Sequence, residues 1–367
     1  MYSQNDLDEA VAARALSAEA AQSFRAFVEQ QRSLPGVDEE HFRLITGFND
    51  VFVAIAGAIL LFAVGWIGQS IGQSLNLQID SDGPSPLAPL AIAITAWGLA
   101  LFFTARRRMA LPSIMLLLAF VGAVFTATGF ALALAVGDPP ASQEAIYGGA
   151  IVSVAGAVAA GAAFIHWKRF RVPITVAAGA AAVSAIAVGL LFAVLGDPDP
   201  YMNIVWSFVL LLGIGVFLFA MRWDSSDPAR VTRRSDVAFW LHLLAAPMIV
   251  HPVFTLLGLN DGTATVGEGL VVIALYVVLG LAALAIDRRA LLVSALAYVL
   301  YALSELFKQV GAVELNIALT ALVIGSALLL LSAFWHQARS MVVRTLPDGL
   351  RARLPYLDRA VITAPAA

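Results

Sequence analysis

Long apolar runs, separated by short polar segments, follow one another along the chain from residue 49 to residue 337. A helix needs about 20 apolar residues to cross a hydrocarbon core, and within lipid a single segment satisfies its backbone polar groups only as a helix. The pattern therefore predicts an all-α polytopic membrane protein with ten transmembrane helices in five hairpins. The predicted spans lie near residues 51–71, 87–105, 110–135, 144–166, 173–195, 202–222, 236–258, 265–286, 290–307 and 315–336.

Basic residues follow one pattern around these spans. Of the 22 Lys and Arg residues, 21 lie in the N-terminal segment, in alternate connections or in the C-terminal tail, and only Lys308 lies in an intervening connection. Because basic residues stay on the cytoplasmic side during insertion, this alternation predicts cytoplasmic termini and an even number of spans. The intervening connections are short, acidic and made of turn residues.

Composition narrows the class of protein further. The chain of 367 residues is 60% hydrophobic and 13% charged, whereas a soluble domain carries about 25% charge. It has no cysteine, so we expect neither a disulfide framework nor a thiolate metal site. Its acidic, polar start lacks the features of a signal peptide. The sequence shows no metal-ligand spacing, phosphate-binding loop or nucleic-acid patch, so we expect no metal, no cofactor and no nucleic-acid partner.

Two segments of the chain resemble copies of one unit. They read RRRMALPSIMLLLAFVGAVFTATGFALALAVGDPP and KRFRVPITVAAGAAAVSAIAVGLLFAVLGDPDP, and a weaker third copy starts at Asp287. Each full copy has a basic cluster, a proline where the span begins and Gly-Asp-Pro where it ends. A unit of two spans predicts a parallel repeat, in which all copies share one orientation. The fourth and fifth spans are rich in Gly and Ala, which predicts close helix packing.

The two ends of the chain differ from its centre, and three parts are predicted. Residues 1–48 form a cytoplasmic helical segment, residues 49–337 the transmembrane domain, and residues 338–367 a cytoplasmic tail of interfacial helices on anionic headgroups. In the first part Ser17 is expected to cap a helix. One face of that helix, expected to dock on the inner loops, another chain or a protein partner, carries Ala20, Phe24, Phe27, Val28 and Gln31.

Several stretches carry a resemblance to a known group of proteins. They are SAEAAQSFRAFVEQ, GFNDVFVAIAGAILL, TARRRMALPSIMLLLAFVGAVF, FWLHLLAAPMIVHPVF and GLRARLP. With them, most of the chain resembles uncharacterised bacterial inner-membrane proteins that have a short helical cytoplasmic N-terminus and eight or more spans. The resemblance implies a multi-pass protein of the bacterial inner membrane and implies no particular activity.

The seventh span, FWLHLLAAPMIVHPVF, contains two histidines and two prolines. Pro247 and Pro252 cannot donate to the carbonyls four residues before them, which predicts a kink in the outer half of the span. At 1.5 Å per residue, His242 lies roughly 10 Å and His251 roughly 24 Å above the helix start. The two rings point to nearly opposite faces, so they are not a pair of haem ligands. For His242 we expect a hydrogen bond to a neighbouring helix.

His251 shares its depth with two carboxylates on the next two spans. Glu268 lies in the first turns of the eighth span, and Glu305 lies near the outer end of the ninth. The ninth span also carries a polar stripe at helical spacing, made of Ser294, Tyr298, Tyr301, Glu305 and Lys308. Since ionisable residues inside a membrane face a partner or an aqueous cavity, these residues predict a polar pocket in the outer half of spans seven to nine.

Structural roles for the same residues remain open. Glu305 can pair with Lys308 at a helix end, and Glu268 can complement the dipole of its own helix. Tyr298 and Tyr301 can serve as packing residues, and Tyr301 as an interface anchor.

Three classes of function fit the sequence. The leading prediction is a permease or channel-like protein for a small polar solute, an ion or a lipid headgroup. The second is a membrane scaffold or sensor that binds a protein partner through residues 1–48. The third is an intramembrane enzyme that acts on a lipid-linked substrate through a carboxylate–histidine pair. An enzyme is the least favoured, because no reactive group lies on a substantial loop; whether the chain forms oligomers stays open.

Overall fold

The computed structural model describes residues 11–13, 16–24, 48–80, 82–228, 230, 232–258, 266–309, 314–351 and 354–355. For residues 266, 268, 290, 293–295, 297, 298, 302, 305, 306 and 309 it describes the backbone only. The chain forms two units, residues 1–43 and residues 44–367. The long helices of the described residues all belong to the second unit.

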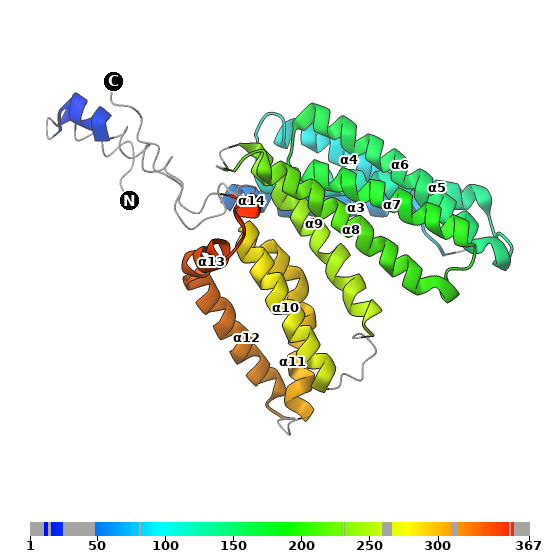
Figure 1. Cartoon of the computed structure of the whole chain (residues 1–367). Helices are drawn as coiled ribbons and strands as arrows, with labels where there is room; N and C mark the ends of the chain where they lie inside the picture. The colour runs from blue at the N-terminus through cyan, green and yellow to red at the C-terminus, as the bar shows by residue number, and fades with distance from the viewer. Residues whose placement is uncertain are drawn as a thin grey trace. The chain divides into compact units, whose positions relative to one another are not determined.

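The described part of the chain is helical and contains no strand, which confirms the predicted all-α class (Figure 1). The long helices are α3 (Phe48–Ser74), α4 (Leu87–Phe103), α5 (Ala110–Val136), α6 (Glu144–Phe170), α7 (Ile174–Leu195), α8 (Met202–Ser225), α9 (Arg233–Leu256), α10 (Val266–Ile286), α11 (Ala290–Gln309) and α12 (Asn316–Ala333). The shorter elements are the 3₁₀ turns η1 (Ala141–Gln143) and η2 (Asp199–Tyr201) and the helices α13 (Trp335–Arg344) and α14 (Asp348–Arg351).

Eight candidate spans among the described residues are long and apolar enough to cross a membrane, and α4 is a shorter apolar helix of 17 residues. The chain is therefore an integral, multi-pass membrane protein by the length and composition of its helices. The ten long helices coincide with the ten predicted segments, and the count of ten crossings, like the cytoplasmic placement of the termini, stays a prediction.

Most long helices pack against their neighbours in sequence, and α9 has two further partners. The closest antiparallel pairs are α6 with α7 and α8 with α9, and α10 pairs with α11. Helix α9 also contacts α7 and α11, so it lies between the helices that precede it and those that follow it (Figure 1).

The predicted repeat is visible in the turns. Helices α5 and α7 end at Gly137 and Gly196, with φ of 69° and 70°, and each is followed by Asp-Pro and a 3₁₀ turn. The turns that begin the copies contain Arg108, Arg171 and, in the third copy, Asp287, with φ of 54°, 56° and 61°. A residue in the left-handed backbone conformation ends a helix, because the chain after it no longer follows the helix axis. We call the end of the bundle that holds these three turns and the 226–232 turn the basic end.

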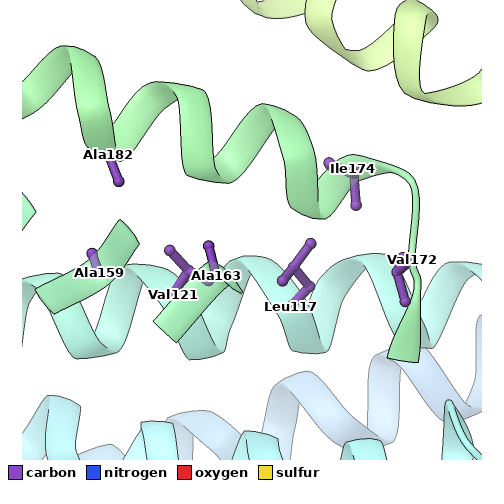
Figure 2. Close-up of a cluster of buried hydrophobic side chains, with 7 residues drawn as sticks. All are labelled: Leu117, Val121, Ala159, Ala163, Val172, Ile174 and Ala182. Atoms are coloured by element: carbon purple, nitrogen blue, oxygen red, sulfur yellow. The ribbon is translucent and has the colours of Figure 1, made fainter. Parts of the chain in front are cut away.

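Small side chains allow α6 and α7 to approach closely, as the sequence predicts. A Cβ atom on Gly149 would lie 2.4 Å from the carbonyl oxygen of Gly189, and one on Gly189 would lie 2.6 Å from that of Gly149. Ser153 bridges the same pair by donating to the carbonyls of Gly149 and Ile186. Figure 2 shows the adjoining apolar cluster, in which α5 meets α6, α7 and the turn between them through Leu117, Val121, Ala159, Ala163, Val172, Ile174 and Ala182.

Helix α9 continues through both of its prolines, from Arg233 to Leu256. Pro252 leaves the carbonyl of Met248 without its helical donor. At this level α8 presents Gly213, and a Cβ atom there would lie 2.8 Å from both the carbonyl carbon and the carbonyl oxygen of Met248. Because Gly213 has no side chain, the backbone of α8 packs directly against the Met248 carbonyl that Pro252 leaves without a donor.

The N-terminal unit is described over residues 11–13 and 16–24. Residues 18–24 are helical, and the Ser17 Oγ accepts a hydrogen bond of 3.1 Å from the amide of Ala20, which confirms the predicted cap. Ala20 and Phe24 are exposed within this unit, whereas Ala21 is buried. The remaining residues of the predicted docking face, Phe27, Val28 and Gln31, lie outside the described residues.

Close approach at Gly213 makes this position sensitive to a single methyl group. We expect Gly213→Ala to lower the melting temperature of the purified protein in detergent, because overpacking costs about 1–3 kcal/mol. Gly215→Ala is the matched control on the same helix, since a Cβ atom there meets nothing within 4 Å. The control should melt at or slightly above the wild-type temperature. Equal melting of the two variants would contradict the tight contact between α8 and α9.

Candidate functional site

Buried charged side chains gather at the basic end, where α8 ends, α9 begins, α10 turns into α11, and α13 packs against α10. The group is made of Asp224, Arg230, His242, Asp287, Arg288, Trp335 and Arg339, and we call it the ion network. Its members lie up to 115 positions apart in the sequence, between Asp224 and Arg339. Two carboxylates organise it, one on α8 and one in the turn between α10 and α11.

Asp224, in the last turn of α8, is the first centre. The Arg288 Nη2 donates to Oδ1 at 2.5 Å, and the Arg288 Nε donates to Oδ2 at 3.3 Å, so the guanidinium binds both oxygens. The His242 Nε2 lies 2.8 Å from Oδ2. The exposed fractions of Asp224, Arg288 and His242 are 1%, 3% and 0%, so water does not screen these contacts.

The contact with Asp224 also fixes the form of the His242 ring. A carboxylate only accepts hydrogen bonds, so the Nε2 of His242 carries a proton and donates it. The Nδ1 is buried and has no hydrogen-bond partner in the described part of the chain. A neutral ring with its proton on Nε2 matches these surroundings, whereas a second proton on Nδ1 would be a buried donor without an acceptor.

Asp287 is the second centre and follows the last residue of α10. The Arg230 Nη1 donates to its Oδ2 at 2.9 Å, and the Trp335 Nε1 donates to its Oδ1 at 2.7 Å. Arg339 of α13 approaches Oδ1 at 3.8 Å. The Nη2 of Arg230 also donates to the backbone carbonyls of Ile286 and Asp287, which closes the C-terminal end of α10.

The surroundings of Asp287 determine its charge state. Burial on its own raises the pKa of this carboxyl group. The positive charges of Arg230, Arg339 and Arg288, together with the hydrogen bond from Trp335, more than offset burial and hold the pKa below its usual value. Asp287 is therefore a carboxylate at neutral pH.

Local hydrogen bonds shape the 226–232 turn, which presents Arg230 to Asp287. One oxygen of Asp227 accepts from both the amide and the hydroxyl of Thr232, at 2.9 and 2.7 Å. The Thr232 hydroxyl oxygen in turn accepts from the amide of Arg234 and caps α9. Arg230 itself has φ of 54°, a left-handed conformation that directs its side chain back toward the turn after α10.

The predicted polar pocket lies at the opposite end of the same helices. His251 is half-buried in α9, and its ring packs edge-on against Trp206 of α8, with 4.8 Å between the ring centroids. Tyr301 and Lys308 of α11 are both exposed. Glu268 belongs to the first turn of α10, and Ser294, Tyr298 and Glu305 belong to α11, but their side chains lie outside the described residues.

The structure gives the backbone positions of the three predicted ionisable groups along their helices. His251 lies five residues before the end of α9, Glu268 two residues after the start of α10, and Glu305 four residues before the end of α11. Helix α11 packs against both α9 and α10. Next to Glu305 in sequence, the hydroxyl of Ser304 accepts a 2.7 Å hydrogen bond from Asn316, which joins α11 to α12. The pocket itself stays a prediction.

Sequence reasoning expected a hydrogen bond from His242 to a neighbouring helix, and the structure supplies it in Asp224. The sequence does not predict the rest of the ion network, because the positions of Arg230 and Arg288 beside predicted spans indicate only membrane orientation. The available signal was the presence of Asp224, Asp227 and Asp287 among those arginines. Basic residues that only orient a membrane protein need no acidic neighbours.

No family model, no curated protein and no solved structure matches the chain. Over the ranges that the structure describes, His, Asp and Glu side chains do not form a group of three that could hold a metal ion. The ion network can therefore be assigned only from its own geometry. It joins α8, α9, the α10–α11 turn and α13 through short polar contacts.

Removing the Asp224 carboxylate should destabilise the fold strongly. Asp224→Asn leaves the Arg288 guanidinium buried without a counter-charge, and breaking a buried pair in this way costs about 3–5 kcal/mol. The double variant Asp224→Leu/Arg288→Met should recover much of the loss, because no charge then remains unpaired. Melting in detergent, followed by size-exclusion chromatography, measures both.

Asp348→Asn is the control for this experiment, since Asp348 also pairs with an arginine, Arg351 at 3.4 Å, but its side chain is 98% exposed. Exposed pairs contribute little, so this variant should melt like the wild type. Wild-type melting of Asp224→Asn would show that Asp224 and Arg288 are not a buried pair.

The lowered pKa of Asp287 predicts a specific loss of stability in acid. A group with a depressed folded-state pKa stabilises the fold above its unfolded pKa, here 3.8, and loses that contribution as the pH falls through the folded-state value. Between about pH 5 and pH 3, Asp287→Asn should therefore lose less of its melting temperature than the wild type does. For Asp348→Asn, the melting temperature should fall with pH as steeply as it does for the wild type. If the melting temperature of Asp287→Asn fell with pH as steeply as that of the wild type, this would contradict the lowered pKa of Asp287.

Proposed function

We propose that the chain is a permease or channel-like protein of the bacterial inner membrane that handles a small polar solute, an ion or a lipid headgroup. Its basic end faces the cytoplasm. The proposed path follows α9 from the predicted polar pocket at His251, Glu268 and Glu305 to the ion network around Asp224. The observation that carries the proposal is that one central helix contacts a buried charged cluster through His242 and carries a half-buried histidine, His251, toward its other end.

The packing of α9 supports a role beyond anchoring. Half of the apolar stretch of α9 is buried by other helices, a larger share than for any other candidate span in the described part of the chain. A helix that only anchors a chain in lipid has no need of two histidines and two prolines. Charges inside a membrane protein are costly, and where they occur they commonly mark solute or ion pathways.

The ion network has the properties of a closed gate at the basic end. It connects the end of α8 and the start of α9 to the α10–α11 turn. Separation of α10 and α11 from α8 and α9 therefore requires Arg288 to leave both Asp224 and the backbone carbonyl of Ser235. Asp287 and Arg230 must separate in the same movement. A state open at this end would hydrate these charges, and a solute shifts the equilibrium only by binding one state better than the other.

A scaffold or sensor is the second candidate, and the docking of α13 favours it. The indole of Trp335 and the guanidinium of Arg339 attach α13 to Asp287. A protein that bound the tail would therefore act directly on the ion network. In this case the network would transmit a binding event, and no solute would cross.

Flux through reconstituted protein tests the permease. Proteoliposomes with a pH-sensitive or cation-sensitive dye inside report movement of H⁺, Na⁺ and K⁺, and radiolabelled amino acids report movement of small zwitterions. Glu305→Gln keeps the shape and removes the charge. It should lower the flux at least about tenfold, because a hydrogen bond to a charged group contributes about 1.5–3 kcal/mol. His251→Ala should also weaken the flux, because it removes the polar group that α9 contributes to the proposed path.

Leu300→Ala is the control, because Leu300 lies on α11 outside the polar stripe and is exposed. It should leave the flux unchanged. If the flux of these solutes into proteoliposomes were no faster than into protein-free vesicles, the chain would not be a permease for these solutes. Equal flux through wild type and Glu305→Gln would remove Glu305 from the path and favour the scaffold.

A further inference from the structure

Two turns at the basic end carry basic residues that the ion network does not use. The α4–α5 turn and the end of α6 with the α6–α7 turn contribute six exposed side chains, which we call the basic rim: Arg106, Arg107, Arg108, Lys168, Arg169 and Arg171. The sequence has no Asp or Glu from residue 102 to residue 114 or from residue 164 to residue 174. Within the described ranges, no rim side chain makes an ion pair, in contrast to Arg230 and Arg288.

The two halves of the basic rim are neighbours in space. Phe170, at the end of α6, packs edge-on against Trp97 of α4, with 5.2 Å between the ring centroids. Val172 and Ile174, which follow it, pack with Leu117 of α5. The contacts bring the ends of α4 and α6 and the starts of α5 and α7 together, so six like charges lie along one edge of the bundle.

Aromatic rings hold four of these charges close to the apolar surface. The Arg107 guanidinium lies 5.5 Å from the ring centre of Phe102, and the Lys168 ammonium lies 4.7 Å from that of Phe164. Arg169 stacks on Phe170 at 5.6 Å, and Arg171 stacks on Trp167 at 5.8 Å. A cation over an aromatic face is stabilised there, which favours a position beside the helix over one in open solvent.

The surface directly beside the basic rim is apolar and exposed. Phe102, Phe164 and Ile165 all point away from the helix bundle, and Phe164 is 57% exposed. A ligand that matches both features has a negative head and an apolar body. Inorganic phosphate would satisfy the charges alone, and a water-soluble protein would not reach side chains at the depth of the hydrocarbon.

We propose that the basic rim is a binding site for an anionic phospholipid. The phosphate lies among the arginines of the two turns, and the acyl chains run along the exposed side chains of Phe102, Phe164 and Ile165. Basic clusters between helices at a membrane surface are suited to anionic headgroups. The topological role of basic residues ends with insertion and requires neither aromatic stacking nor the absence of acidic neighbours.

Titration of the delipidated full chain in detergent with phosphatidylglycerol or phosphatidylcholine, read by native mass spectrometry, tests the site. The wild type should bind phosphatidylglycerol more tightly. The variant Arg107→Gln/Arg169→Gln/Arg171→Gln should weaken that binding, by roughly fivefold for each neutralised residue. Inorganic phosphate in excess should not displace the lipid.

The matched control is Arg222→Gln/Arg233→Gln/Arg234→Gln, which removes the same charge from exposed positions at the basic end around a turn with acidic residues. It should bind phosphatidylglycerol like the wild type. If the rim triple variant does not fold, the single variants Arg107→Gln and Arg171→Gln replace it. Each should bind phosphatidylglycerol about fivefold more weakly than the wild type. Equal losses in rim and control variants, equal binding of the two lipids, or displacement by inorganic phosphate would each overturn the site.

Discussion

Burying a carboxylate among apolar helices is unfavourable unless an opposite charge and hydrogen bonds replace the water that it loses. Asp224 meets this condition through Arg288, which binds both of its oxygens, and through His242. The three residues come from α8, the α10–α11 turn and α9. Because none of these charges can be left unpaired in the interior, the pairing fixes where the turn lies against the two helices.

The second carboxylate extends this order to α13. Once Arg288 is bound to Asp224, the residue before it, Asp287, faces Arg230 of the 226–232 turn and the first residue of α13. Asp287 has the same left-handed backbone as Arg108 and Arg171 in the other repeat copies. The third copy thus has an acidic residue at a position where the first two have an arginine, and among the described residues the buried network forms at this copy.

This difference between the repeat copies separates the arginines of the basic end into two kinds. In the third copy Arg288 is drawn into the protein by Asp224, while Asp287 binds Arg230 from the preceding turn. The turns that begin the first two copies contain no acidic residue, and their arginines stay at the surface, where Arg107 and Arg171 lie on aromatic rings. One repeated turn therefore produces a buried network of ion pairs in one place and an exposed charged rim in another.

The sequence alone determined the helical class, the positions of the long helices and the cap at Ser17, because apolar length and capping are properties of contiguous residues. It also predicted the close packing of α6 with α7 from their small residues and the hydrogen bond of His242 to another helix. It did not identify Asp224 as the partner of His242 or of Arg288, which lies 64 residues away. Which charges meet depends on which helices are adjacent and how they are rotated. Those features follow from packing across the whole bundle, which brings together residues far apart in the sequence.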